Sequence, residues 1–177
     1  MVGLVYYYFA DVRVLLLFLH ESKCKNMSGI RAVGIVIKNS QVLLIHRLNE
    51  GSEYWVLPGG GVEPNETVEA AVVRELKEET SLDVSVDRLL YHARYDQTED
   101  EGFYYLCTST STEAQLDPDA PESITMLEGK QKFAPVWMPL EQLSEIILYP
   151  LEIRDQFLED LKSNFSSVPQ DILLKSY

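Results

Sequence analysis

Apolar and polar positions along the chain predict several short strands. Two apolar runs rich in β-branched residues, residues 32–37 (AVGIVI) and 41–46 (QVLLIH), are separated by Lys38-Asn39-Ser40, a spacing typical of a β-hairpin. Further strands are predicted at residues 55–57, 84–90, 103–107 and 133–138. Most strands therefore occur in runs, with the helical patterns between or behind them.

Three segments have a helical pattern. Residues 67–79 (TVEAAVVRELKEE) contain no Gly or Pro and consist mostly of good helix formers. Residues 140–146 and 151–165 are also predicted as helices, and in the second the apolar residues recur at steps of three and four. Runs of strands followed by helices predict an α+β fold or an α-β-α sandwich.

The N-terminal segment allows three interpretations. Residues 4–20 form an apolar run that Asp11 and Arg13 interrupt near its middle, which disfavours a spanning helix, and no cationic leader or cleavage site marks a secretory signal. It is an added packed element, a membrane-surface element, or a segment that precedes the natural start at Met27. We therefore expect an N-terminal extension over residues 1–26, a domain over 27–165 and a C-terminal tail over 166–177.

Composition narrows the function classes. The 177 residues suit one domain, and the formal charge of −13 argues against a protein that binds nucleic-acid polymers nonspecifically, because such proteins need a cationic surface. A nucleotide substrate remains compatible with this charge if a bound metal cation supplies positive charge. The two cysteines, Cys24 and Cys107, are too few for a disulfide framework and favour reduced thiols in a cytoplasmic protein.

The chemistry concentrates on the helix predicted at residues 67–79. At 100° per residue, Glu75 and Glu79 lie about 40° apart and Glu78 about 60° to the other side of Glu75, so three carboxylates share one face. Such a set repels itself unless a cation intervenes, and oxygen ligands suit Mg²⁺ or Mn²⁺. Arg74 stands four residues before Glu78 and is placed to orient that carboxylate. The competing interpretation is a solvated charged face.

A glycine run precedes this helix. Gly59-Gly60-Gly61 lets the backbone approach a ligand or ion closely and offers free carbonyl groups. The run lacks the GxxxxGK[ST] pattern, which excludes a P-loop. It also lacks the GxGxxG pattern, so a Rossmann fold has no support.

Together these residues resemble the Nudix box, the signature of the Nudix hydrolases. Eight of nine defined positions match in the string Gly60-x5-Glu66-x7-Arg74-Glu75-Leu76-x-Glu78-Glu79-x-Ser81-Leu82. The departure is Ser81, where the family has a Gly that ends the helix in a left-handed conformation. The flanking strings IRAVGIVI, QVLLIHR, YWVLPGGG and PVWMPLEQL also resemble the family, so the likeness runs over residues 30–148.

The resemblance implies a Nudix-like α-β-α sandwich with a mixed central sheet and an Mg²⁺-dependent hydrolase. Such enzymes cleave a nucleoside diphosphate linked to a moiety X by attack of water on phosphorus. The implied metal ligands are Glu75, Glu78, Glu79 and the Gly59 carbonyl, with Mn²⁺ as a substitute for Mg²⁺. Glu78 and Glu79 are thereby catalytic, Arg74 orients carboxylates, and Glu66 assists the site indirectly.

The remaining roles rest on single residues. Glu128, in a loop before the last strand, is a candidate general base, although a solvated loop acid is an equal interpretation. Arg47, at a strand end, is a candidate for binding a substrate phosphate, and Tyr54, Trp55, Tyr105 and Phe133 are candidates for stacking on a base. We expect no membrane association, and a homodimer is compatible with the sequence.

The substrate is the least defined part of this interpretation. The family's markers for ADP-ribose or dinucleoside polyphosphates are not evident beyond the box, so a nucleoside triphosphate, with an oxidised one among the candidates, is the default expectation. The alternative is a nucleotide-sensing or scaffold protein that has the fold without turnover. The intact set of acidic residues counts against this alternative.

Overall fold

The first two strands form the predicted hairpin. The computed structural model describes residues 29–49, 51–111, 113–116, 131–163, 165 and 168–175. Strands β1 (Ile30–Lys38) and β2 (Gln41–Asn49) are antiparallel, with Ile37 opposite Val42. The two turn residues, Asn39 and Ser40, both have positive φ, 50° and 60°, as a tight two-residue hairpin requires.

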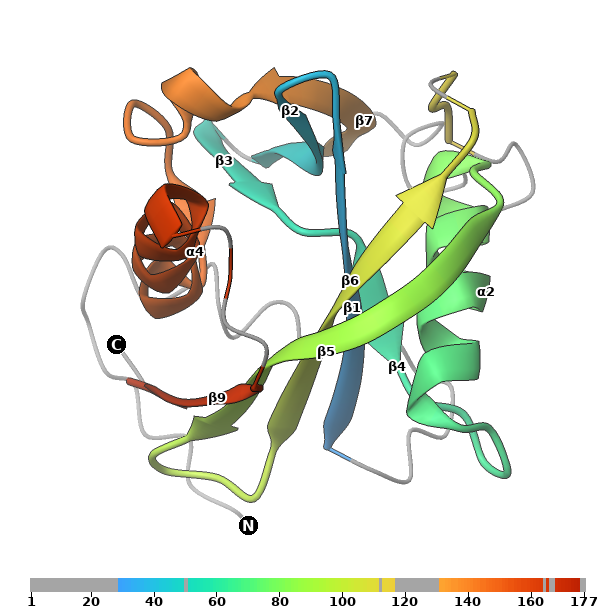
Figure 1. Ribbon diagram of the computed structural model, residues 1–177, viewed down its shortest axis with the longest axis vertical. Helices are drawn as coiled ribbons and strands as arrows, with labels where there is room; N and C mark the ends of the chain where they lie inside the picture. Colours follow the sequence, from blue (N-terminus) through green and yellow to red (C-terminus); the bar gives the residue numbers. More distant parts are fainter. Residues whose placement is uncertain are drawn as a thin grey trace, which may run out of the picture.

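The strands build one mixed sheet (Figure 1). Its order is β8-β3-β2-β1-β6-β5-β9, with β4 paired to β1 and β7 paired to β2. Strands β1 and β6, β3 and β8, and β5 and β9 are parallel neighbours, whereas the other pairs are antiparallel. The remaining elements are β3 (Ser52–Val56), β4 (Gly59–Gly61), α2 (Val68–Thr80), β5 (Val84–Tyr95), β6 (Glu101–Ser109), β7 (Gln131–Pro139), the 3-10 turn η1 (Leu140–Gln142), β8 (Leu148–Tyr149), α4 (Leu151–Ser163) and β9 (Gln170–Leu174).

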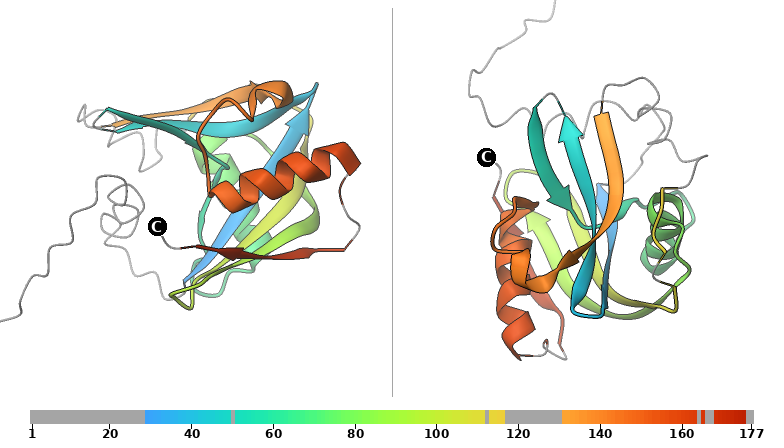
Figure 2. Two further views of the ribbon diagram at one scale, coloured as in Figure 1. Left: turned by 90° about the vertical axis from the view of Figure 1, so that its left-hand side faces the viewer. Right: turned by 90° about the horizontal axis from the view of Figure 1, so that it is seen from above.

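Helices α2 and α4 cover opposite faces of this sheet (Figures 1 and 2). Alternate residues of β1 divide between two cores: Ala32 packs in the core beneath α2, and Val33 packs in the core beneath α4. Helix α2 buries Ala71, Val72 and Leu76, and α4 buries Ile153 and Phe157. The predicted α+β sandwich with a mixed sheet is confirmed.

The helix predicted over residues 140–146 is wrong. Only the 3-10 turn η1 forms, and Leu143 is fully buried in the core beneath α4. The backbone then leaves the turn so that the Ile147 carbonyl can accept a hydrogen bond from the Trp55 N–H at 2.8 Å and β8 can pair with β3. Strand pairing therefore overrides the local helical pattern. The helix predicted over 151–165 forms and ends at Ser163.

The expected C-terminal tail contains a strand of the sheet. Strand β9 pairs in parallel with β5, from Tyr91 opposite Gln170 to Tyr95 opposite Leu174, and Leu174 is buried. The folded unit therefore extends past residue 165. The expected N-terminal extension, residues 1–26, and Met27 lie outside the described residues. No helix in the described part of the chain has the length and apolar content needed to cross a bilayer.

Candidate active site

Helix α2 carries the acidic residues, and both of its ends are capped. Thr67 is the N-cap, and its hydroxyl accepts a hydrogen bond from the Ala70 N–H at 3.2 Å. At the other end Ser81 has φ 57° and its N–H bonds to the Lys77 carbonyl at 2.9 Å. Ser81 thus adopts the left-handed conformation that a Gly would take at this position, and the helix keeps its carboxylates in register.

Strand β4 brings the glycine run against both β1 and α2. Gly59 has φ 148°, and a Cβ at this position would overlap the Ala32 carbonyl and the Val33 backbone. A Cβ at Gly60 would overlap the carboxylate of Glu75. Glycine at these two positions is what allows β1, β4 and the acidic face of α2 to approach so closely.

Glu79 is the most deeply placed acid of the site. Its side chain is 5% exposed, and its Oε2 accepts a hydrogen bond from the Gly59 N–H at 2.8 Å. The Arg47 guanidinium, from β2, lies 3.9 Å from the other oxygen, Oε1, and packs 4.6 Å above the Phe133 ring. Arg47 therefore reaches the acidic cluster, and its expected contact with a substrate phosphate stays a prediction.

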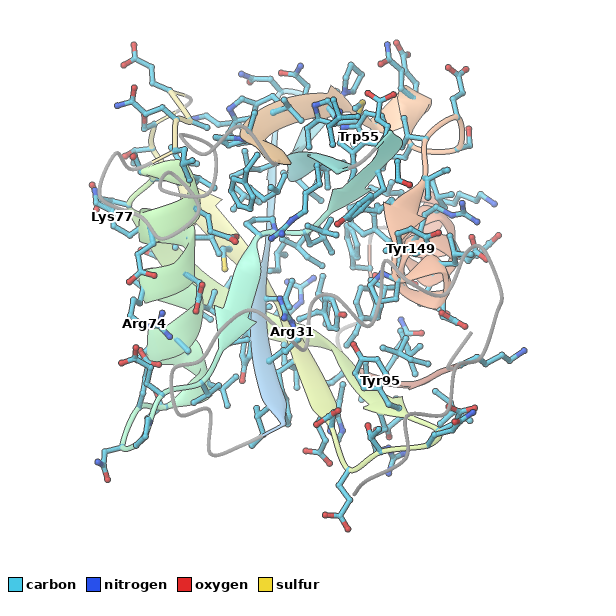
Figure 3. The ribbon with its side chains drawn as sticks, turned by 180° about the vertical axis from the view of Figure 1, so that it is seen from behind. Arg31, Trp55, Arg74, Lys77, Tyr95 and Tyr149 are labelled. Carbon is cyan, nitrogen blue, oxygen red and sulfur yellow. The ribbon has the colours of Figure 1, made fainter. Side chains whose placement is uncertain are left out.

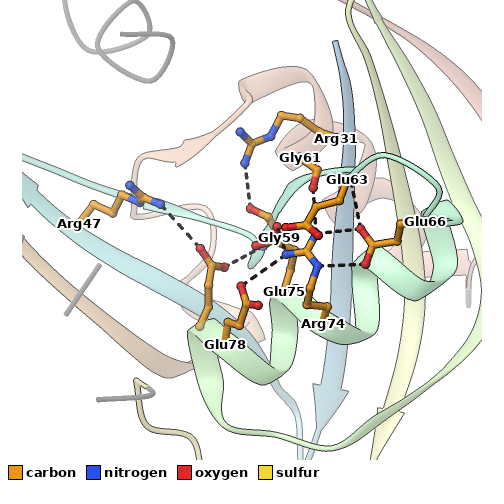
Figure 4. Close-up of polar contacts among 10 residues, drawn as sticks. Arg31, Arg47, Gly59, Gly61, Glu63, Glu66, Arg74, Glu75 and Glu78 are labelled. Carbon is orange, nitrogen blue, oxygen red and sulfur yellow. Dashed lines mark hydrogen bonds and ion pairs between the residues drawn. The ribbon is translucent and has the colours of Figure 1, made fainter. Parts of the chain in front are cut away.

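Arg74 holds three other carboxylates (Figure 4). It binds Glu66 through two parallel hydrogen bonds of 2.9 Å, from Nε and Nη2. Nη1 donates to Glu75 at 2.8 Å and to Glu78 at 3.4 Å, and Nη2 also donates to the Gly61 carbonyl at 3.0 Å. This guanidinium links the helix to the glycine loop and fixes the directions of the acids around it.

The pKa values of Glu66 and Glu75, the two acids closest to Arg74, are shifted in opposite directions. The hydrogen bonds from Arg74 lower the pKa of Glu66, and they outweigh the effect of burial. Burial raises the pKa of Glu75, and although Arg74 opposes this, the neighbouring Glu78 adds to it. Glu66 is therefore a fixed anion paired to Arg74, whereas Glu75 is a carboxylate whose charge is not fully compensated by its protein neighbours.

Arg31 is a residue of the site that sequence reasoning missed. Its Nη2 donates to the Gly59 carbonyl at 2.9 Å. The register of β1 on β4, with Arg31 opposite Gly61, brings the side chain there. The only signal in the sequence is an arginine that shares the inward face of β1 with Val33 and Ile35.

The other candidate residues do not gather at the acids. Tyr105 lies on the α2 side, where its hydroxyl donates to Glu69 at 2.9 Å, and Trp55 stacks on His46 with centroids 4.8 Å apart. Tyr54 is buried against Tyr149. Glu128, the candidate base, lies outside the described residues.

The donor chemistry of the site fits a hard divalent cation. The carboxylates of Glu75, Glu78 and Glu79 and the Gly59 carbonyl offer only oxygen, which suits Mg²⁺ or Mn²⁺. Within the described ranges, no three acidic, His or Cys side chains converge closely enough to hold an ion as they stand. These carboxylates have protein donors as partners instead: Nη1 of Arg74 contacts Glu75 and Glu78, and the Gly59 N–H donates to Glu79.

Comparison with known proteins agrees with this geometry. A family model described as "NUDIX domain" matches residues 29–161, which is most of the chain. The chain belongs to the Nudix family. The match takes in the elements from β1 to most of α4, including the acidic helix and the glycine run, and ends before β9.

Several proteins of known name are similar to this chain in sequence. An ADP-ribose pyrophosphatase of Methanocaldococcus jannaschii is 43% identical over 81 residues, which are 45% of this chain and 44% of that protein. A diphosphoinositol polyphosphate phosphohydrolase 3-alpha of Mus musculus is 28% identical over 126 residues, 71% of each chain. An RNA pyrophosphohydrolase of Erythrobacter litoralis is 27% identical over 140 residues, 67% of this chain and 80% of that one. The chain spans less than half the length of the M. jannaschii relative.

Solved Nudix structures share the fold. The crystal structure of a Nudix hydrolase from Nitrosomonas europaea superposes with a TM-score of 0.65 at 15% identity, over 82% of this chain and 78% of that one. An ADP-ribose pyrophosphatase from Streptococcus suis superposes with a TM-score of 0.57 at 21% identity, over 81% of this chain and 97% of that one. At these identities the likeness concerns the fold alone.

Proposed function

We propose that this chain is an Mg²⁺-dependent Nudix hydrolase that cleaves the diphosphate bond between a nucleoside and a moiety X. The observation that carries the proposal is the junction of α2 with β4, where Glu79 accepts from the Gly59 N–H, the Glu75 carboxylate packs against Gly60, and Arg74 joins Glu66 to both Glu75 and Glu78. Every acid that the Nudix box requires is present and lies at this junction.

The residues of the chain divide into two groups by what they do. Glu75, Glu78, Glu79 and the Gly59 carbonyl would hold the cation, which supplies charge neutralisation of the diphosphate and a water of lowered pKa. Arg74 orients these carboxylates because its guanidinium contacts Glu75 and Glu78 and is anchored on Glu66 and the Gly61 carbonyl. Fixed positions of this kind reduce the reorganisation that phosphoryl transfer requires.

Arg47 supports the proposal from the opposite side of the cluster. Its guanidinium lies at Glu79 and against the Phe133 ring, at the end of the antiparallel β2-β3-β7 region that adjoins the acids. From this position we assign it to a phosphate oxygen of the substrate, since arginine binds phosphate with a planar pair of donors. For the general base that accepts the proton of the attacking water, the candidates are Glu128 and an acid of α2.

The compounds mentioned in the relatives' names share one chemical feature. The names ADP-ribose pyrophosphatase, diphosphoinositol polyphosphate phosphohydrolase and RNA pyrophosphohydrolase all point to linked phosphates, while the groups attached to these phosphates differ. We therefore propose a small phosphoanhydride substrate of nucleotide type, with nucleoside triphosphates, including oxidised ones, and ADP-ribose as the first to be tested. A cytoplasmic location and a homodimer stay predictions.

One experiment separates the proposal from its alternative. The full chain is incubated with Mg²⁺ and a panel of nucleoside triphosphates, ADP-ribose, dinucleoside polyphosphates and diphosphoinositol compounds, and the phosphate products are quantified. Turnover of one substrate class supports the hydrolase and identifies X. Measurable nucleotide affinity without turnover of any compound would instead favour a nucleotide-sensing or scaffold protein on the Nudix fold.

A further inference from the structure

Arg31 contacts a backbone atom that belongs to the expected ligand set. Its Nη2 donates to the Gly59 carbonyl at 2.9 Å, and the Gly59 N–H donates in turn to Glu79. A guanidinium thus binds one expected ligand, the carbonyl, while Arg47 lies 3.9 Å from another, the Glu79 carboxylate. Two arginines from two different strands therefore occupy contacts that a divalent cation would also use.

Strand pairing builds the Arg31 contact. Residues 31–33 of β1 pair with Gly61, Gly60 and Gly59 of β4, and from this register the Arg31 guanidinium reaches the Gly59 carbonyl. Gly59 approaches β1 so closely that no Cβ fits there. The position of the Gly59 carbonyl relative to the Arg31 backbone is therefore set by the sheet, whereas the guanidinium stands at the end of a long side chain that can change rotamer.

Charge makes this contact sensitive to both a cation and an anion. An ion held by the Gly59 carbonyl would add positive charge at the oxygen that the Arg31 guanidinium contacts at 2.9 Å. The two positive groups repel each other in this partly buried place, where the charge of Arg31 also acts on Glu75. A phosphate group nearby removes the conflict because it accepts hydrogen bonds from the guanidinium.

The remaining donors of Arg31 point to the same role. The side chain is partly buried, and in the described part of the chain its hydrogen bonding consists of the one contact to the Gly59 carbonyl. Figure 3 shows it between Arg74 on one side and Tyr95 on the other. Since a guanidinium has five N–H groups, a planar set of donors remains for an anion next to the acids.

We propose that Arg31 is a phosphate-binding residue that exchanges the Gly59 carbonyl for a substrate phosphate when a divalent cation takes that carbonyl. Cation and phosphate then bind cooperatively. The phosphate offsets the repulsion between the cation and Arg31, and the cation takes the Gly59 carbonyl and so frees the guanidinium for the phosphate. The inference rests on the proposed function, since it takes the ligand set from the Nudix box. It adds a residue that lies outside that box.

The test measures metal binding without turnover. Mn²⁺ is titrated into the full-length protein and free Mn²⁺ is followed by electron paramagnetic resonance, with and without inorganic phosphate. In the wild type, phosphate should tighten Mn²⁺ binding by at least about fivefold, the lower range of coupling between two ligands. Arg31→Met should bind Mn²⁺ alone about fivefold more tightly than the wild type, and phosphate should then add less than about twofold.

Two further variants make the result specific. Lys77→Met removes one positive charge from α2 at a side chain that contacts Asp83, and it should keep the coupling of the wild type. Arg31→Lys keeps the charge but lacks the planar donors, so its coupling should be smaller than that of the wild type. This second variant carries the test if circular dichroism shows that Arg31→Met does not fold.

The proposal is overturned if folded Arg31→Met binds Mn²⁺ as the wild type does in both conditions. It is equally overturned if Arg31→Met binds Mn²⁺ more weakly, because Arg31 would then merely support the loop. Its failure is distinct from failure of the proposed function: a wild type that binds Mn²⁺ but hydrolyses no compound of the panel overturns only the latter. A wild type without Mn²⁺ affinity overturns both.

Discussion

At the scale of single residues, Glu79 is the acid whose position is most closely fixed by its surroundings. It is buried, it accepts a hydrogen bond from the Gly59 N–H, and it lies next to Arg47. Glu79→Gln keeps an acceptor for the Gly59 N–H but removes the negative charge. We expect it to lower kcat by about a hundredfold or more, as loss of one preorganised electrostatic group does, with little change in Tm.

The matched control for this variant is Glu69→Gln. Glu69 is exposed in the first turn of the same helix, where it accepts from the Tyr105 hydroxyl. Its activity should stay within about twofold of the wild type, because it touches none of the proposed ligands. A near-full rate in Glu79→Gln would remove Glu79 from the ligand set.

Glu66 provides a prediction about pH at the same scale. Because Arg74 lowers the pKa of Glu66 in the fold below its unfolded value, the ionised carboxylate stabilises the fold above pH about 4, and this contribution is lost as pH falls through the lowered pKa. Glu66→Gln removes it. The difference in unfolding free energy between wild type and variant, measured by urea denaturation from pH 3 to 7, should be about 1–2 kcal/mol at neutral pH.

The prediction depends on how this difference in unfolding free energy changes with pH. It should shrink toward the acid end of the range, since both proteins then carry an uncharged side chain at position 66. A difference that stays constant from pH 3 to 7 would mean that the Glu66 charge does not contribute, and that the variant acts only through packing.

At the scale of elements, helix α2 ends in a residue that is not the best for its conformation. Ser81 has φ 57°, and its hydroxyl makes no hydrogen bond within the described residues. Ser81→Gly removes the steric cost of the left-handed conformation, at about 1 kcal/mol, although glycine also gains freedom in the unfolded chain. We expect a net stabilisation of about 0.5 kcal/mol, seen as a higher Tm with unchanged activity.

A variant at the opposite end of the helix supplies the comparison. Thr67→Ala deletes the N-cap hydrogen bond to the Ala70 N–H and should destabilise the protein by about 1 kcal/mol. If Ser81→Gly instead lowered Tm, the serine would be making a favourable contribution that the backbone conformation does not reveal.

Elements with strong local signals were predictable, and those shaped by their neighbours were not. The hairpin turn at Asn39-Ser40 and the capped helix α2 follow from local rules, and both formed as expected. Strand β5 is longer than predicted: it continues to Tyr95, because the polar residues His92 and Arg94 end the apolar run without ending the pairing with β6. The pattern at residues 140–146 is helical, yet no α-helix forms there because the chain must turn so that β8 can pair with β3.

At the scale of the whole molecule, the same division applies to the site. The acids of α2 are close in sequence, so helical geometry alone placed them on one face. Arg31 lies 28 residues before Gly59, and only the pairing of β1 with β4 brings the two together. Arg47 and Glu79 likewise meet through the stacking of α2 against the sheet. The Nudix box therefore identifies the acids of the site, but it does not identify Arg31 and Arg47, which come from strands outside the box.

The last strand decides where the folded unit ends. Leu174 of β9 is 1% exposed in the core beneath α4, and Gln170 of the same strand donates to the buried Asp160 carboxylate at 2.8 Å. A domain that ended at residue 165 would expose the edge of β5 and leave this core open. Strand β9 is therefore expected to contribute to the stability of the entire sandwich.

Two neighbouring leucines of β9 test this expectation, because they face opposite sides of the strand. Leu174→Ala creates a cavity in the core and should lower the unfolding free energy by about 2–4 kcal/mol. Leu173, 61% exposed, is the matched control, and Leu173→Ala should change it by less than about 0.5 kcal/mol. Equal effects of the two substitutions in urea denaturation would show that β9 is not packed on the core, and the folded unit would then end before it.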